Sequence, residues 1–81
     1  MRRRRIFCVE TYRRRAGVAE REVVQEYESG AEAEEVALAL SSRRSGVALY
    51  QVEVDTAGMW SEPDVLATYG DVPAVDFQSP P

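Results

Sequence analysis

The sequence predicts an α+β fold with the element order ββαββ, in which a four-stranded, largely antiparallel sheet carries one helix on one face. Three observations predict this fold. An amphipathic helix with residues typical of both a helix start and a helix end begins after Ser29. The most strand-like run of the chain follows it at residues 47–54. Each of the five glycines stands where an element should end. At 81 residues the chain makes a single domain, which we place at residues 1–73, followed by an irregular tail at residues 74–81.

Residues 6–12 are typical of a strand, because apolar and aromatic side chains dominate them and arginines bracket them at both ends. Successive side chains of a strand point to opposite faces of the sheet. We expect the face without charge to lie toward the helix, and it carries Phe7, Val9 and Thr11. The other face carries Ile6, Cys8, Glu10 and Tyr12.

Residues 16–28 fit two descriptions. As a helix they offer one apolar stripe, and as a strand they offer apolar residues separated by polar ones. Gly17 favours the strand, because a glycine there closes a tight turn and supplies the first strand with a partner. The cap at Ser29 also requires a separate element that ends just before it, so we predict a second strand.

The helix is predicted over residues 30–44. The Ser29 hydroxyl is suited to accept a hydrogen bond from a first-turn N–H, and Glu32 three residues later completes a capping box. Arg43 and Arg44 stand near the negative end of the helix dipole, and Gly46 is expected to end the helix in a left-handed conformation. The buried stripe consists of Ala33, Val36, Ala37 and Leu40, and Leu38 falls on the outer face.

Residues 47–54 are rich in β-branched and aromatic side chains and predict a third strand. One face is apolar apart from a tyrosine hydroxyl and carries Ala48, Tyr50, Val52 and Val54. We therefore expect this face to lie under the helix. The opposite face begins apolar and ends polar, and it carries Val47, Leu49, Gln51 and Glu53.

The rest of the chain predicts a turn, a loop and a last strand. Residues 55–58 have the pattern of a type I turn, with aspartate first and glycine fourth. Residues 59–63 are expected to form a loop in which Trp60 is at least partly buried; an exposed Trp60 would make it, with Met59, a candidate contact surface. Residues 65–69 form the last strand, which ends at a glycine.

Catalysis and metal binding have little support in the composition. The chain has no histidine, and its only thiol, Cys8, is expected to be a small buried hydrophobe. Glu10 and Glu53 would approach as a carboxylate pair if their strands paired in register, although solvated strand faces carry such residues routinely. We find no cysteine–histidine cluster, EF-hand spacing or glycine-rich phosphate loop, so neither a cofactor nor a metal is expected.

The first candidate site is an apolar patch on the sheet face away from the helix. An open face should alternate cleanly with polar residues, and here the alternation fails on two strands. We expect this patch to contact a protein partner, with a homodimer as the simplest closed solution. It consists of Ile6, Cys8, Tyr12, Val47 and Leu49. The alternative is that the tail covers it through Val75 and Phe77.

The second candidate site is basic. Seven arginines against one glutamate give residues 1–15 a net charge of +6, whereas three arginines against thirteen acids give the remainder −10. Such a row suits phosphates or an acidic partner. It comprises Arg2, Arg3, Arg4, Arg5, Arg13, Arg14 and Arg15. The competing interpretation is that these arginines keep an apolar strand soluble or pair with the chain's own acids.

The leading functional hypothesis is a non-enzymatic protein-interaction or self-associating module. A weak, electrostatic nucleic-acid-binding module that uses the arginine segment is the alternative, and an accessory domain of an enzyme complex is the third. A lone cysteine and the shortness of every apolar run lead us to expect a cytoplasmic protein without a membrane partner.

The cap gives a first prediction. Ser29→Ala removes the hydroxyl that accepts a first-turn N–H, so we expect the free energy of unfolding to fall by about 1 kcal/mol. Denaturant titration followed by circular dichroism measures the change. An unaltered midpoint would show that the helix does not depend on this cap.

Overall fold

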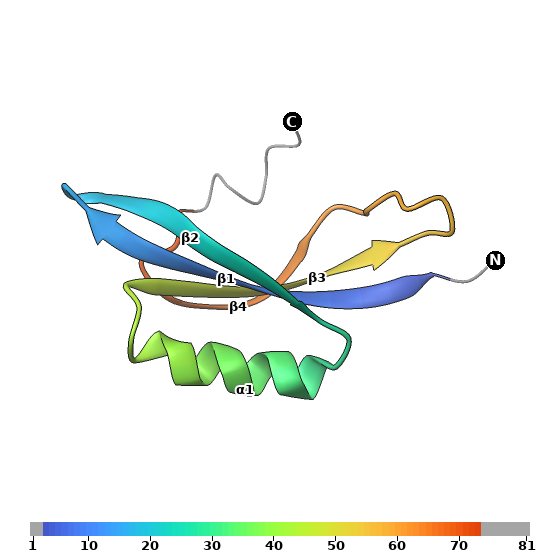
Figure 1. Cartoon of the computed structure of the whole chain (residues 1–81), viewed down its shortest axis with the longest axis horizontal. Helices are drawn as coiled ribbons and strands as arrows, with labels where there is room; N and C mark the ends of the chain where they lie inside the picture. Colours follow the sequence, from blue (N-terminus) through green and yellow to red (C-terminus); the bar gives the residue numbers. More distant parts are fainter. Residues whose placement is uncertain (1–2, 74–81) are drawn as a thin grey trace.

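The computed structural model describes residues 3–73 and confirms the predicted fold class. Four antiparallel strands form one sheet in the order β2-β1-β3-β4, and one helix packs on one face of it (Figure 1). The elements in chain order are β1 (Arg4–Arg15), β2 (Val18–Tyr27), α1 (Gly30–Ser41), β3 (Gly46–Val54) and β4 (Asp64–Gly70). The predicted tail at residues 74–81, with Val75 and Phe77, lies outside the described residues.

The first two strands form the predicted hairpin, so the strand interpretation of residues 16–28 is confirmed. Ala16 and Gly17 both have positive φ, 52° and 80°, which is the backbone of the two-residue turns that match strand twist. The ladder runs from Arg15 opposite Val18 to Phe7 opposite Tyr27. It is interrupted by a bulge next to Thr11 and Tyr12, which leaves Glu22 without an opposite residue.

The helix begins where predicted and ends earlier. The Glu32 N–H donates to Ser29 Oγ at 3.2 Å, which confirms the cap. The helix stops at Ser41 rather than at residue 44, because the N–H groups of Arg43 and Arg44 both donate to the Leu40 carbonyl in a tightened last turn. The two arginines therefore lie just beyond the helix, and the serines at its end turn their hydroxyls back onto helix carbonyls.

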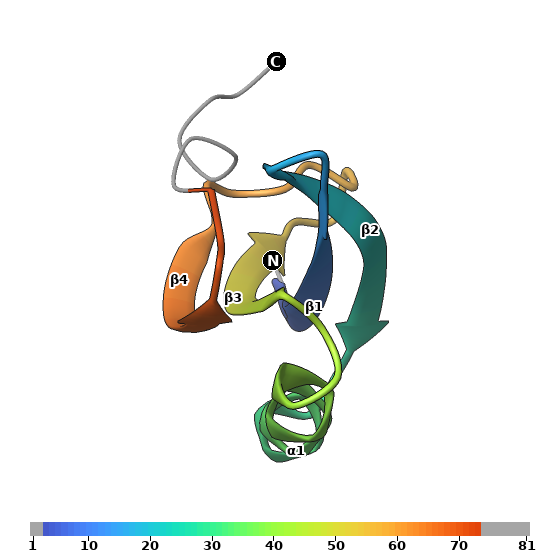
Figure 2. The ribbon, with the colours of Figure 1, turned by 90° about the vertical axis from the view of Figure 1, so that its left-hand side faces the viewer.

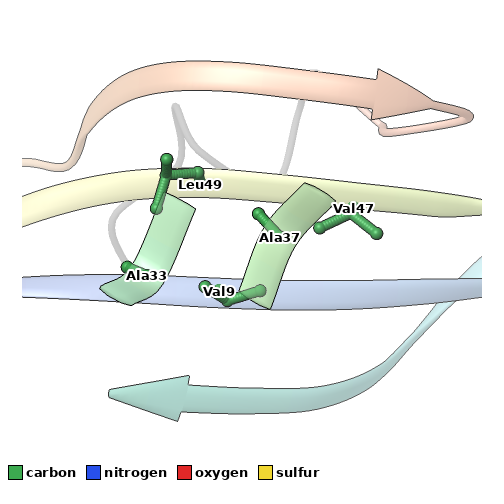
Figure 3. Packing of buried hydrophobic residues seen from close by; sticks show 5 residues of the cluster. All are labelled: Val9, Ala33, Ala37, Val47 and Leu49. Atoms are coloured by element: carbon green, nitrogen blue, oxygen red, sulfur yellow. The ribbon is translucent and has the colours of Figure 1, made fainter. Parts of the chain in front are cut away.

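The helix packs mainly against β1 and β3 through the predicted stripe. Ala33 and Ala37 are fully buried, and their small side chains let the helix lie close to the sheet. They meet Val9, Val47 and Leu49 in one compact core (Figure 3). Partly buried side chains complete this core at its margin: Phe7, Tyr27, Val36, Leu40, Ala67 and Tyr69.

The predicted facing of the third strand is wrong. Val9 lies opposite Leu49, and Thr11 lies opposite Val47, so these residues of β3 must share the helix side with their partners on β1. The helix of 12 residues is about 18 Å long, whereas the nine-residue strand is about 30 Å long. The helix therefore covers only part of β3, and the polar end of this face need not be buried beneath it. Gln51 therefore projects past the start of the helix and is only partly buried.

The opposite face of the sheet forms a second small core. Figure 2 shows the four strands arranged in an arc, with the helix against one side of it. Twist of this kind brings the side chains on the other side toward one another. They are buried without a second helix, and the cluster comprises Ile6, Cys8, Tyr50 and Val52, with Val54 at its edge.

Gly46 does not end the helix in a left-handed conformation, as the sequence predicted; it begins β3. Its role is steric. An ideal Cβ on Gly46 would lie 1.9 Å from the Asp71 carbonyl oxygen, because the chain after β4 crosses close to it. The Asp71 N–H donates to the Ser45 carbonyl at 2.9 Å and holds the two segments together.

The connection between β3 and β4 begins with the predicted turn. The Gly58 N–H donates to the Asp55 carbonyl at 3.0 Å, and Asp55 Oδ1 accepts from the N–H groups of Ala57 and Met59. Trp60 then forms an isolated bridge with Val54 but is 48% exposed, so it stands among the exposed apolar side chains and does not cover the core as expected. Within residues 3–73 no helix has the length and apolar character needed to cross a bilayer.

The close approach at Gly46 gives a second prediction. Gly46→Ala places a methyl group against backbone that cannot swing aside, so we expect a loss of about 1–3 kcal/mol in the free energy of unfolding. The control is Gly58→Asn, since nothing lies within 4 Å of a Cβ there and asparagine tolerates its positive φ. Equal unfolding midpoints for the two variants would contradict the steric role.

Candidate functional site

The apolar patch predicted to contact a partner does not form a surface. Ile6, Cys8 and Tyr12 do lie on the face away from the helix, but all three are buried within the chain itself. Val47 and Leu49 lie beneath the helix, on the other face. In this structure the five residues are therefore buried on two different faces of the sheet, and a contact role for them stays a prediction.

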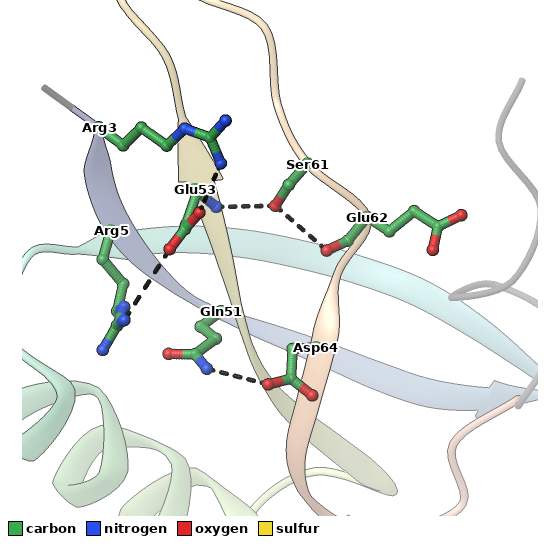
Figure 4. Close-up of polar contacts among 7 residues, drawn as sticks. All are labelled: Arg3, Arg5, Gln51, Glu53, Ser61, Glu62 and Asp64. Carbon is green, nitrogen blue, oxygen red and sulfur yellow. Dashed lines mark hydrogen bonds and ion pairs between the residues drawn. The ribbon is translucent and has the colours of Figure 1, made fainter. Parts of the chain in front are cut away.

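The arginine row is split between the two ends of β1. Arg5 and Arg13 are eight strand residues apart, which corresponds to about 26 Å. At the first end, Arg3 and Arg5 both pair with Glu53, at 3.1 and 3.9 Å (Figure 4). Arg4 pairs with Glu28 at 3.8 Å. Arg2 lies outside the described residues.

The arginines at the other end of β1 are also paired. Arg13 lies 3.7 Å from Glu22, and Arg15 lies 3.9 Å from Glu20. Arg14 pairs with Asp71 and also donates to the Gly17 carbonyl at 3.0 Å. All described arginines of this segment thus have an acidic partner within the chain, which is what the competing interpretation predicts. Exposed pairs of this kind contribute only ~0.2–1 kcal/mol each, so a ligand can compete for them.

The face away from the helix contains a buried acid. Glu10 is 2% exposed, and its carboxylate accepts from the Tyr12 hydroxyl at 3.1 Å and from the Arg21 guanidinium at 3.2 Å. These bonds offset the loss of hydration that an isolated buried charge would suffer. Glu53 is on the other face and at the far end of β3, so the two acids do not form a carboxylate pair.

Cys8 and Tyr50 face each other in the same core. Burial raises the pKa of the Cys8 thiol, an effect that the hydrogen bond from Tyr50 opposes and the charges of Glu26 and Glu10 reinforce. Burial also raises the pKa of Tyr50, with a further contribution from the Glu10 charge. A thiol that is fully buried and hard to ionise cannot serve as a nucleophile, in line with its expected structural role.

The exposed apolar side chains lie elsewhere. Met59 is 67% exposed, and it is followed by Trp60 and by two exposed residues of β4, Val65 and Leu66. This stretch lies along the edge of the sheet, because β4 is its last strand. The sequence did identify Met59 and Trp60 as an alternative contact surface, but it contained no signal that β4 would be an edge.

A second surface feature lies at the end of β1 beyond the helix. Arg13 and Arg14 meet Arg43 and Arg44 there, around a hollow of about 310 Å³ that Glu22 and Ser45 complete. The Arg14 N–H donates to Ser45 Oγ at 3.1 Å, which ties the end of β1 to the segment before β3. The sequence placed Arg43 and Arg44 at the helix end but did not bring them to the other two arginines.

Comparison of the chain with protein-family models, with curated proteins and with solved structures gave no match. Among residues 3–73, no group of three or more cysteine, histidine or acidic side chains is placed to hold a metal ion. Two surface features of the described chain are therefore the candidate sites. They are the β4 edge with its exposed apolar side chains and the arginine-lined hollow.

The buried Cys8–Tyr50 pair gives a third prediction. Their pKa values are raised above the usual 9.0 and 10.0, so both groups are neutral in the folded and unfolded chain only well below pH 9, and the unfolded thiol is half ionised at that pH. Above that pH the unfolded chain loses its protons first, so the free energy of unfolding should fall, by at most ~1.4 kcal/mol per pH unit for each group.

Urea titrations between pH 8 and pH 11 measure this slope. Tyr50→Phe should reduce it, whereas the control Tyr27→Phe, which alters an exposed hydroxyl bonded to Gln25, should leave it as in the parent. A slope that is the same in the parent and in Tyr50→Phe would contradict the prediction.

Proposed function

We propose that this protein is a non-enzymatic, self-associating interaction module, in which two copies pair through the outer edges of β4. The observation that carries the proposal is the contrast between the two edges of the sheet. An edge strand presents unpaired backbone N–H and C=O groups and is a template for another strand unless charge or distortion blocks it.

The two edges differ in charge. β2, at one edge, has four charged residues among ten: Glu20, Arg21, Glu22 and Glu26. β4, at the other edge, has one among seven, Asp64, and that residue stands at its start. Each edge strand contains one bulge, so distortion does not distinguish them. The lack of charge makes β4 the edge that favours pairing.

Exposed apolar side chains accompany the same edge. Val65 and Leu66 are in β4 itself, and Met59 and Trp60 precede it in the connection from β3. Removing such side chains from water on association stabilises the associated state by ~25 cal/mol per Å². The β2 edge also exposes valines, but they share their strand with four charged residues rather than one.

A second copy is the occupant that this edge fits best. Two β4 strands related by a two-fold axis run antiparallel, so their pairing extends the antiparallel sheet from four strands to eight. The dimer is closed, because each copy uses its β4 edge in the contact and leaves no second β4 edge exposed. The buried free thiol of Cys8 takes no part in such a contact and is consistent with the reducing, cytoplasmic setting that we propose.

Leu66→Lys tests this proposal, because it introduces a charge that two-fold symmetry places near its own copy. We expect the dissociation constant of the dimer to rise by at least about tenfold, or ~1.4 kcal/mol. Sedimentation velocity over a concentration series measures it. The control is Leu38→Lys, since Leu38 is similarly exposed, 53% against 46%, but lies on the outer face of the helix.

Dissociation in Leu66→Lys with an unchanged dimer in Leu38→Lys supports pairing at β4. A parent protein that stays monomeric at every concentration would overturn the proposal. So would a dimer that both variants weaken equally. Thermal melts of both variants confirm that each remains folded, which is expected because both leucines are exposed.

A further inference from the structure

The arginine-lined hollow is built from residues that are distant in the sequence. Arg13 and Arg14 end β1, whereas Arg43 and Arg44 follow the helix. Antiparallel pairing brings these segments together, since Tyr12 lies opposite Gly46 and the Arg14 N–H donates to the Ser45 hydroxyl. The sheet register therefore gathers the side chains of Arg13, Arg43 and Arg44 at the hollow. Arg14 contributes its backbone there, because its guanidinium is bound to Asp71 and the Gly17 carbonyl, which do not line the hollow.

The hollow is locally cationic in an acidic protein. Because Arg14 is paired with Asp71, the three other arginines and Glu22 give the lining a net charge of +2, whereas the whole chain carries −4. Arginine presents several N–H groups in a planar fork that matches the oxygens of carboxylates and phosphates. Several arginine side chains gathered at one place on an acidic protein favour binding of a small anion there over nonspecific binding of polyanions.

Glu22 already shows how an oxyanion sits in the hollow. Its two carboxylate oxygens are divided between two arginines, with Oε1 3.2 Å from Arg44 Nε and Oε2 3.7 Å from Arg13 Nη1. Glu22 is the residue that the β2 bulge leaves without a partner on β1, and the bulge places its carboxylate between the arginines. The carboxylate thus occupies a position that a stronger anion would take.

Two groups remain for such an anion. Arg43 makes no ion pair with any other residue of the described chain, and its exposed guanidinium lines the hollow. The Ser45 hydroxyl accepts the Arg14 N–H through its oxygen, which leaves its own proton available to donate. A ligand with several oxygens can bind both groups and draw Arg13 and Arg44 away from Glu22.

We propose that this hollow binds a compact ligand with more than one phosphate group, of the diphosphate class. Its volume of about 310 Å³ is at the lower end of the ~300–1,000 Å³ of small-molecule sites. None of the six lining residues is aromatic, so the hollow has no platform on which a base would stack. The arginines at the far end of β1 lie about 26 Å away, too far to continue it as a track for nucleic acid.

Calorimetric titration of the full-length protein with inorganic diphosphate tests the proposal. Arg43→Gln should weaken binding about fivefold, the effect expected for one exposed charge contact. Glu22→Gln should have the opposite effect and tighten binding by a similar factor, because it removes the carboxylate that competes for the arginines. Added salt should weaken binding in the parent.

Arg4→Gln is the control, since it removes an exposed arginine at the other end of β1. It should leave diphosphate affinity unchanged. Inorganic phosphate should bind more weakly than diphosphate, because it reaches fewer of the guanidinium groups of Arg13, Arg43 and Arg44. The two opposite shifts in Arg43→Gln and Glu22→Gln, with Arg4→Gln unaltered, support the site.

Several results would overturn it. These are the absence of saturable diphosphate binding to the parent at low salt, an Arg4→Gln loss equal to that of Arg43→Gln, and binding of single-stranded RNA without binding of diphosphate. The tests are independent of the dimer, because Leu66 and the β4 edge do not line the hollow.

Discussion

The antiparallel pairing of β1 with β3 is the constraint on which the rest of the structure depends. It runs without interruption from Arg4 opposite Val54 to Tyr12 opposite Gly46 and forms the centre of the sheet. Directly opposite residues share a face, so this register decides which side chains the helix covers and which lie in the second core. A shift by one residue would exchange the two sets.

The same register explains the placement of charge. Glu10 lies on the face away from the helix, where tyrosine and arginine satisfy its carboxylate, and Glu53 lies on the other face beside Arg3 and Arg5. The bulge in β2 turns Glu22 toward the arginines at the end of β1. Most of the described arginines therefore have an acidic partner, and the exposed pairs among these contribute little to stability.

The two proposed contact surfaces follow from the two ends of this arrangement. The β4 edge, which has one charged residue among seven, and the neighbouring Met59 and Trp60 form an apolar surface suited to a second copy of the chain. The hollow where β1 ends beside the helix is a cationic surface suited to phosphate groups. They involve different residues, so a dimer can form with the hollow open to its ligand.

The sequence by itself determined the elements. The Ser29 cap, the alanine stripe of the helix, the turn glycine at Gly17 and the β-branched run at residues 47–54 each act through neighbours in the chain, and all were predicted. Their effects are local, because capping, periodicity and turn chemistry depend on residues a few positions apart. One of the two interpretations of the basic segment also paired its arginines with the chain's own acids, and its six described arginines have such partners.

Only the tertiary structure decided which face of β3 lies under the helix, why Gly46 must be glycine, and where the candidate sites are. The polar residues at the end of one face of β3 led to the prediction that the other face lies under the helix. That prediction is wrong because the helix covers only part of the strand's length, which the sequence does not reveal. The clash at Gly46 involves Asp71, which is 25 positions away. The hollow likewise joins Arg13 to Arg43 through strand pairing, and the exposed edge at β4 follows from strand order. Both depend on long-range register, which no local pattern in the chain specifies.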